Sequence, residues 1–193
     1  MNKYKLGDLV SFVPGINQTR AENQYKDIDI VYYDQLAFDD DFRRDSKNTE
    51  TRKTNELSLL SGDIIISHTS KKAAEVSKKN EGKVHTINFI KVQFKDNRLD
   101  KHYFLYMFNS SVNVQKQKEM ELRKNGLFSK LTLKSLENIE IPLPPQKKQE
   151  EIGKIYIETL NLKNKLMKKI SLIEQATNIM LEKEITENNY EEN

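Results

Sequence analysis

The sequence predicts an α+β fold in which a mixed globular head is followed by one long C-terminal coiled-coil helix. Three of the four prolines, Pro142, Pro144 and Pro145, stand together and interrupt regular structure, because proline has no backbone N–H and a fixed φ. After Pro145 no proline follows and Gly153 is the single glycine, so the last 48 residues can continue as one helix. Before the prolines, apolar runs such as residues 103–108 supply a core for the head.

The first hundred residues contain four stretches with the composition of strands, within residues 6–13 and at residues 28–33, 64–67 and 87–94. The isoleucines of the third stretch favour a buried strand, because β-branched side chains suit a pleated surface. The fourth stretch carries apolar groups on both faces, which indicates a central strand covered on each side. Residues 39–56 are polar, and we expect them to form an exposed loop.

Helical signals follow residue 99. Asp100 is placed to cap an aromatic-rich helix that ends near Phe108, and residues 112–122 support a second, more polar helix. Thr132 is placed to cap a short helix, after which residues 139–141 form a last strand before the prolines.

The long helix carries an apolar stripe at alternating steps of three and four residues, as a coiled-coil seam requires. A helix over residues 149–184 would be roughly 50 Å long at ~1.5 Å per residue, longer than the head can cover. The alternative is a helix packed lengthwise on its own head. We expect a second chain to cover the stripe, and the predicted dimer contacts are Ile152, Ile155, Leu162, Leu166, Ile170, Ile173 and Met180.

Three segments therefore divide the chain. The head occupies residues 1–145, the long helix residues 146–185, and an acidic disordered tail residues 186–193.

Composition limits the chemistry. Cysteine is absent and the three histidines lack zinc-site spacing, so no metal site is expected. The sequence has no apolar run near the ~18 residues of a membrane span and no signal-peptide core, so we expect a cytoplasmic protein that does not enter membranes.

Catalytic signatures are missing as well. There is no glycine-rich phosphate loop, nucleophile elbow or paired-histidine metal motif. The acidic run at residues 39–41 could bind a cation, but a solvated acidic turn is the simpler interpretation. His68 beside Thr69 and Ser70 could pair a base with a nucleophile, but adjacent loop residues seldom hold that geometry. We expect a chain that binds rather than catalyses, and not an enzyme.

Basic residues are concentrated in two places. The net charge is +3, and residues 43–53 and 71–83 each contain five basic and two acidic side chains. Such clusters fit either a nucleic-acid face or solvated loops.

Three ordered stretches resemble the DNA-specificity subunits of type I restriction-modification systems. They are Leu6-Gly7-Asp8-Leu9-Val10 with Gly15 and Arg20 downstream, residues 60–67, and residues 131–152 with the signature Pro-Leu-Pro-Pro-(x)3-Gln-(x)2-Ile. The resemblance implies a target-recognition domain at residues 1–145 joined to one spacer helix. Standard family members contain two such units, so the chain looks like a half-length subunit.

The resemblance also implies partners. Two copies joined through antiparallel spacer helices would read an interrupted palindrome in double-stranded DNA. Adenine methylation with S-adenosylmethionine would belong to partner modification (methyltransferase) subunits, and cleavage to a restriction subunit, so this chain needs no cofactor of its own. The alternative is a protein-interaction module that docks on modification or full-length specificity subunits without reading DNA.

Polar and basic loop residues are the candidates for DNA contact, because such side chains read base edges and phosphates. The predicted DNA-binding residues are Asn17, Gln18, Thr19, Arg20, Arg43, Arg44, Lys47, Arg52, Lys53, His68, Thr69, Ser70, Lys71 and Lys72.

Overall fold

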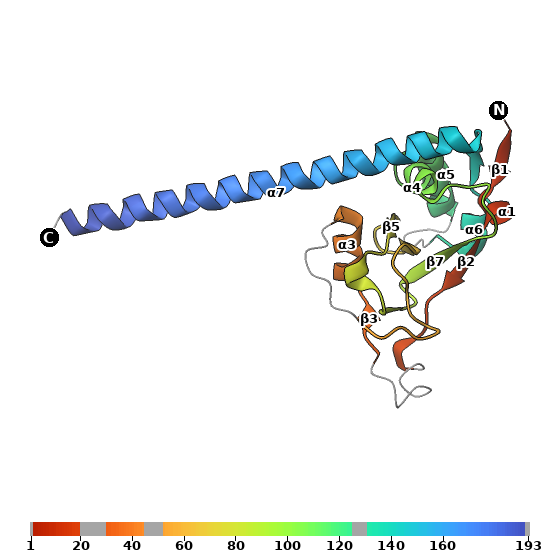
Figure 1. Cartoon of the computed structure of the whole chain (residues 1–193), viewed down its shortest axis with the longest axis horizontal. Helices are drawn as coiled ribbons and strands as arrows, with labels where there is room; N and C mark the ends of the chain where they lie inside the picture. Colours follow the sequence, from red (N-terminus) through yellow and green to blue (C-terminus); the bar gives the residue numbers. More distant parts are fainter. Residues whose placement is uncertain (1, 20–29, 45–51, 125–130, 192–193) are drawn as a thin grey trace.

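The computed structural model describes residues 2–19, 30–44, 52–124 and 131–191, and confirms a mixed head followed by a long helix (Figure 1). In chain order the elements are β1 (Lys3–Lys5), α1 (Leu6–Leu9), β2 (Val10–Pro14), β3 (Tyr32–Tyr33), α3 (Gln35–Arg43), β4 (Ile64–Ser67), β5 (Ala73–Glu75), the 3-10 helix η1 (Lys78–Asn80), β6 (Val84–His85), β7 (Phe89–Phe94), α4 (Lys101–Ser110), α5 (Val112–Lys124), α6 (Leu133–Glu137), β8 (Glu140–Pro142) and α7 (Gln146–Glu191).

The head is organised around a four-stranded antiparallel sheet with strand order β2-β7-β4-β5. Strand β7 is central, as its two apolar faces predicted, although it begins at Phe89 rather than at residue 87. Side chains alternate between two cores: Ile64 and Ile66 pack in a cluster with α4, whereas Ile65 packs in a second cluster with α3. Helices therefore cover both faces of the sheet.

Helix α3 differs from the prediction, because residues 39–43 are helical rather than part of a loop. Asp34 caps the helix by accepting a hydrogen bond from the N–H of Ala37 (2.8 Å). Asp41 is not a solvated acidic residue either: it is buried and accepts hydrogen bonds from the Tyr33 hydroxyl (2.7 Å) and from Asn80 Nδ2 (2.9 Å). The acidic run thus holds α3 onto the head.

Several other boundaries can be compared with the prediction. Asp100 caps α4 and Thr132 caps α6, each with a side-chain oxygen that accepts backbone N–H groups, as expected. The predicted strand at residues 139–141 is β8, which pairs with β1. Of the strand predicted at residues 28–33, β3 contains Tyr32 and Tyr33, while residues 28–29, like residues 45–51, lie outside the described residues.

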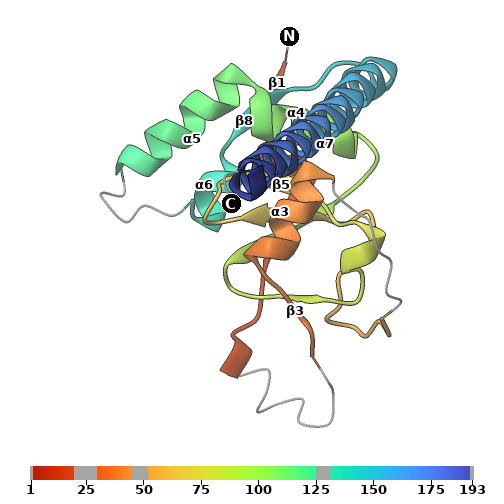
Figure 2. The same cartoon turned by 90° about the vertical axis from the view of Figure 1, so that its left-hand side faces the viewer.

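Helix α7 begins at Gln146, directly after the prolines, and runs to Glu191. The helix thus continues beyond residue 185, where the predicted long helix ended, and residues 192–193 lie outside the described residues. The first turns of α7 lie on α4, the next pass over α3, and the rest of the helix projects away from the head (Figures 1 and 2). Packing lengthwise on the head thus applies to its first part alone.

Candidate nucleic-acid interface

A hollow of about 330 Å³ lies beside β3, where several loops of the head meet. Its lining includes four predicted DNA-binding residues from two separate segments: Asn17, Gln18 and Thr19 after β2, and Thr69 after β4. These four side chains are all exposed. Gly15 lets the segment after β2 pass close to Thr86, another lining residue, since a Cβ atom at Gly15 would lie 2.1 Å from the carbonyl oxygen of Thr86. The fold therefore gathers hydrogen-bonding groups that the sequence separates by about fifty residues.

The turn after β4 carries the other polar candidates. It closes with a hydrogen bond from the N–H of Ser67 to the carbonyl oxygen of Lys72 (3.0 Å), and Lys71 adopts a left-handed conformation with φ of 56°. Thr69 and Ser70 are exposed at its tip, while His68 and Lys71 are half-buried. The turn has an internal anchor, because the Lys118 ammonium donates a hydrogen bond to the carbonyl oxygen of Lys71 (2.8 Å).

Three predicted residues lie instead along the groove between α3 and α7. Arg43, Ser70 and Lys72 line this groove, whose volume is about 560 Å³. The Lys72 ammonium donates to the carbonyl oxygen of Asn109 (2.6 Å), and burial lowers its pKa. Ser70 belongs to the turn described above, so the turn connects the hollow with the groove.

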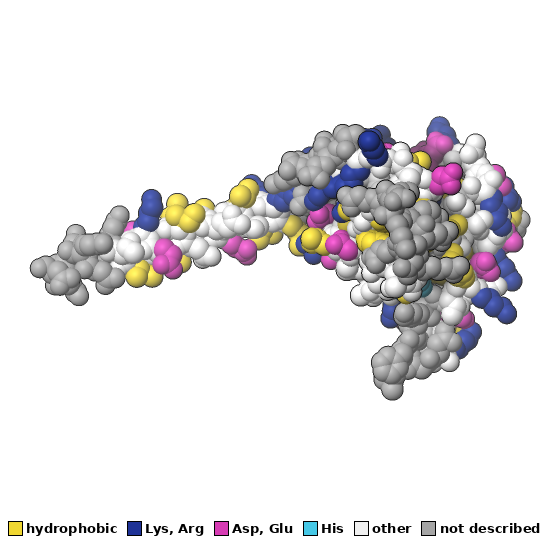
Figure 3. Space-filling view, turned by 90° about the horizontal axis from the view of Figure 1, so that it is seen from below, with side chains coloured by type: hydrophobic (Ala, Val, Ile, Leu, Met, Phe, Trp, Pro, Cys, Tyr) yellow, Lys and Arg dark blue, Asp and Glu magenta, His cyan; other side chains and the backbone are white. Residues whose placement is uncertain are grey.

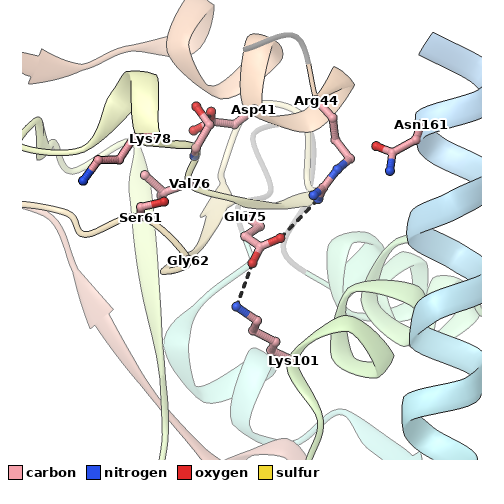
Figure 4. Close-up of a pocket in the computed structure, with 10 residues that line it drawn as sticks. Asp41, Arg44, Ser61, Gly62, Glu75, Val76, Lys78, Lys101 and Asn161 are labelled. Carbon is pink, nitrogen blue, oxygen red and sulfur yellow. Dashed lines mark hydrogen bonds and ion pairs between the residues drawn. The ribbon is translucent and has the colours of Figure 1, made fainter. Parts of the chain in front are cut away.

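Two predicted arginines have structural partners. Arg44 Nη1 lies 3.1 Å from Glu75 Oε2, and the Lys101 ammonium lies 2.7 Å from the other oxygen of that carboxylate (Figure 4). Burial alone would raise the pKa of Glu75, but hydrogen bonds from His102, Lys101 and Arg44 hold it well below its usual range.

Arg52 is the second arginine, and its Nη1 donates to the carbonyl oxygen of Lys79 (2.7 Å). Lys53 is exposed. Arg20 and Lys47 lie outside the described residues and stay predictions.

Sequence reasoning missed several residues of the hollow. Tyr32, Gln35, Ile87 and Asn88 also line it, and the Tyr32 hydroxyl donates to the carbonyl oxygen of Gln18 (3.4 Å). Asn88 was assigned to a strand, although its carbonyl oxygen accepts a hydrogen bond from the N–H of His68 in the neighbouring turn (3.0 Å). The available signal was that Asn88 is polar, whereas residues 90, 92 and 94 on the same face of the predicted strand are apolar.

The hollow is suited to hydrogen bonding rather than to acid–base chemistry. Its lining offers amides and hydroxyls, and Asp34 is the charged residue among the described lining residues. Amides and hydroxyls can pair with base edges. Among the residues that the structure describes, no group of three His, Asp or Glu side chains could hold a metal ion.

Most of the predicted dimer contacts form an exposed stripe on α7, because they recur at steps of three, four and seven residues. Figure 3 shows hydrophobic side chains at the surface along the projecting part of this helix. The exposed fractions are 64% for Ile155, 58% for Leu162, 53% for Leu166, 56% for Ile170, 56% for Ile173 and 67% for Met180. Ile152 is the exception: it is half-buried and packs on the core of its own head, so it does not belong to the exposed stripe. The structure leaves most of this helix face uncovered by the head.

Comparison with known proteins identifies the family. The family described as "Type I restriction modification DNA specificity domain" matches residues 1–175. The chain belongs to this family. Type I DNA specificity domains are non-catalytic, and the relatives below are named specificity subunits.

Two relatives come from Methanocaldococcus jannaschii. The MjaX specificity subunit of a type I restriction enzyme is 28% identical over 139 residues, which cover 69% of this chain and 32% of that protein. The MjaVIII specificity subunit is 24% identical over 189 residues, which cover 97% of this chain and 42% of that protein. The chain thus spans less than half the length of these relatives.

Solved structures share the fold of this specificity domain. The S subunit of the type I restriction-modification system from M. genitalium superposes with a TM-score of 0.54 at 16% identity, covering 87% of this chain and 41% of the other. The HsdS subunit from Thermoanaerobacter tengcongensis superposes with a TM-score of 0.53 at 19% identity, covering 87% of this chain and 39% of that chain. A chain from a type I restriction-modification system, solved in a study of complex assembly and conformational transition, superposes with a TM-score of 0.58 at 18% identity. The match covers 91% of this chain and 42% of that chain.

No helix among the described parts of the chain is both long enough and apolar enough to cross a membrane.

Proposed function

We propose that this chain is a DNA-recognition subunit whose head reads one half-site through the hollow beside β3. The observation that carries the proposal is the meeting of Asn17, Gln18, Thr19 and Thr69 at one exposed hollow, in a chain of the type I DNA specificity family. Amides and hydroxyls of this kind distinguish base pairs in the major groove, whereas lysines and arginines fix the position of the protein on the phosphates. Lys71 and Lys53 are the phosphate contacts that we propose.

Alanine variants test whether amides and hydroxyls contact the bases while lysines contact the phosphates. Gln18→Ala and Thr69→Ala should each weaken binding of the cognate duplex by about tenfold, because one base contact contributes ~1–3 kcal/mol. Binding of unrelated duplexes should change little. Gln146→Ala, an amide on the exposed first turn of α7, is the matched control. The cognate duplex is obtained by selection from a randomised pool with the complex of the chain and its modification subunit.

Lysine variants should behave differently. Lys53→Ala and Lys71→Ala should weaken binding of every duplex and lower the salt-dependence slope by about one for each lysine. If all four variants bind DNA as the parent chain does, the protein-interaction alternative replaces DNA reading.

We further propose that two copies pair through α7 in antiparallel orientation. The exposed stripe supports a coiled coil, and the distribution of charge supports the orientation. Residues 146–170 contain seven lysines and three glutamates, a net charge of +4, whereas residues 171–191 contain one lysine and five glutamates, a net charge of −4. Antiparallel pairing places opposite charges side by side, while parallel pairing places like charges together. Two heads related by a twofold axis would then read an interrupted palindrome.

Charges placed in the seam test the pairing. The double variant Leu166→Glu with Ile173→Glu should sediment as a monomer, because two glutamates would be buried at the interface. The control is Ser171→Glu with Gln175→Glu, which adds the same groups on the opposite side of α7, given ~100° per residue. A dimer that survives the first double variant would show that α7 is not the contact.

The partner modification subunit completes the proposed function. The chain would direct adenine methylation by that subunit, which would bind S-adenosylmethionine, and a restriction subunit would be needed for cleavage. Titration of the dimer with the modification subunit, followed by mapping of methylated adenines, tests this role. A dimer that binds its partner but gives no site-specific methylation would contradict it.

A further inference from the structure

The groove between α3 and α7 is a built surface with mixed apolar and basic lining. Phe42 of α3 and Leu160 and Met167 of α7 supply apolar area, and Met167 is 56% exposed. Arg43, Lys72 and Lys163 supply positive charge, with Asp39 as the acidic residue of the lining. Figure 2 looks along α7 and shows α3 beneath it, and the lining of the groove comes from these two helices, the turn after β4 and the end of α4.

The two walls of the groove are held in place. Asn164 Nδ2 of α7 donates a hydrogen bond to the carbonyl oxygen of Arg44 (3.1 Å), the C-cap residue of α3. Phe42 stacks on Phe38 with ring centroids 6.1 Å apart. The groove is therefore preformed, and its binding partner would not have to order α3 first.

We propose that this groove receives the C-terminal part of α7 from a second copy of the chain, so that each rod also docks on the head of the other copy. The inference rests on the proposed antiparallel pairing and goes beyond it, since rods can pair without touching the heads. If the pair is centred on Ile170, midway between Ile155 and Ile185, residues 173–184 of one helix lie beside residues 156–167 of the other. Those are the positions of α7 that line the groove.

The chemistry of the docked segment complements that of the groove. Residues 173–184 contain three glutamates, Glu174, Glu182 and Glu184, and one lysine. They also carry exposed apolar side chains, with exposed fractions of 60% for Ile179 and 56% for Leu181. Acidic and apolar groups of this segment would meet the basic and apolar groups of the groove, and docking would cover Met167.

Site-specific cross-linking tests the contact, because the parent chain contains no cysteine. Arg43→Cys is combined in turn with Glu174→Cys, Gln175→Cys, Ala176→Cys and Thr177→Cys, four successive positions that present every side of the helix. A short bis-maleimide should join two chains for at least one pair. Within one chain the reaction is excluded, since residues 174–177 lie about 15–20 Å along the helix from Asn164, which contacts α3.

Two further cysteine variants separate the possible outcomes. Ile170→Cys reports rod pairing by itself, because it faces its own copy at the centre of the pair. Lys116→Cys on the exposed face of α5 replaces Arg43→Cys as the control that should not cross-link with any of the four positions. Cross-links at both Ile170 and Arg43 support the inference. A cross-link at Ile170 with none at Arg43 overturns it and leaves rod pairing intact. A monomer with neither cross-link overturns the dimer as well.

Charge exchange supplies an independent readout. Arg43→Glu with Lys163→Glu should weaken the dimer by about tenfold, and adding Glu174→Lys with Glu182→Lys should restore much of the loss. Lys116→Glu should leave the dimer unchanged. Equal dimer dissociation constants for the parent chain and the groove variants would overturn the inference.

Discussion

At the scale of single residues, Gln149, the glutamine that follows the prolines, has a structural role that its place in the sequence does not reveal. Its side chain is 1% exposed. Nε2 donates to the carbonyl oxygens of Arg98 (2.9 Å) and Pro144 (2.9 Å), and Oε1 accepts from the N–H of Asp100 (3.0 Å). One amide therefore satisfies three backbone groups where the proline turn, the start of α4 and the base of α7 meet.

Replacing Gln149 should lower the free energy of unfolding. Gln149→Leu leaves those three backbone groups without the partner they have now, and each buried unsatisfied group costs ~1–3 kcal/mol, so we expect a loss of at least about 2 kcal/mol in unfolding free energy. Gln146→Leu makes the same change at an exposed position one turn earlier and should have little effect. Urea unfolding followed by circular dichroism measures both; equal midpoints for the two variants would contradict this role.

Lys118 is the second residue whose position has a measurable consequence. It is 3% exposed, donates to the carbonyl oxygens of Lys71 (2.8 Å) and Phe108 (3.0 Å), and lies 4.2 Å from the centroid of the Phe108 ring. Burial lowers the pKa of Lys118 to about 7, and the neighbouring charges of Lys72 and Lys71 act in the same direction. The lysine that anchors the turn after β4 thus titrates near neutral pH.

Protein stability should depend on pH through Lys118. Between its folded pKa of about 7 and its unfolded value of 10.5, the unfolded chain holds a proton that the folded chain lacks, so stability rises with pH across this window. The slope for one proton approaches ~1.4 kcal/mol per pH unit. Lys118→Met should remove this component from the stability-against-pH curve, whereas Lys116→Met, exposed on the same helix, should keep it. Parallel curves for parent and Lys118→Met would contradict the assignment.

At the scale of elements, the contact between α4 and α7 depends on Gly153. A Cβ atom at Gly153 would lie 2.8 Å from His102 Cβ, 2.9 Å from Asp100 Oδ1 and 2.9 Å from the backbone nitrogen of Tyr103. The two helices can approach this closely because glycine has no side chain. In the sequence, Gly153 appeared only as the single glycine of an otherwise uninterrupted helix, and no pattern marked it as a contact.

The sign of the stability change on replacing Gly153 by alanine shows whether Gly153 is an ordinary helix position or a close contact with α4. At an exposed helix position, replacing glycine by alanine stabilises the helix by ~1 kcal/mol. Gly153→Ala should instead lower the unfolding free energy, because backbone and capping atoms of α4 cannot move away cheaply. Thermal unfolding measures the difference from the parent chain. A raised melting temperature would mean that α7 does not need this close approach.

Elements that depend on neighbouring residues were predictable from the sequence, and those that depend on distant partners were not. Asp100 and Thr132 cap helices through N–H groups two or three residues away, so their local patterns were sufficient. Helix α3 was missed because its acidic residues resemble a loop, and Asp41 is explained by Tyr33 and Asn80, which the sequence does not place beside it.

In the candidate site, too, the residues with a local sequence pattern were predictable, and those placed by distant partners were not. Polar loop chemistry pointed to Asn17, Gln18, Thr19 and Thr69, and these four residues line the hollow. Tyr32 and Asn88 join them through the pairing of β3 with β6 and the turn before β7, which no local pattern encodes.

At the scale of the whole molecule, two hydrogen-bonding side chains of α7, far apart along the helix, add to the packing of α4 that holds the head on the rod. Gln149 fixes the base of α7, and Asn164 fixes α3 about four turns further along, at ~3.6 residues per turn. Contacts spread over these turns of the helix fix the orientation of the head on the rod. In the proposed dimer, the distance between the two heads would therefore follow the length of helix between them, and with it the gap between the two half-sites.

Insertion of one heptad after Ile170 tests this relation. Seven residues keep the stripe in phase and lengthen the rod by about 10 Å at ~1.5 Å per residue. At 3.4 Å per base pair, the gap in the methylated sequence should grow by about three base pairs while each half-site keeps its sequence. An insertion of two residues turns the stripe by ~200° and should abolish the dimer. Mapping methylated adenines with the partner modification subunit measures the gap; an unchanged gap in a heptad variant that still dimerises would show that the rod does not set the spacing.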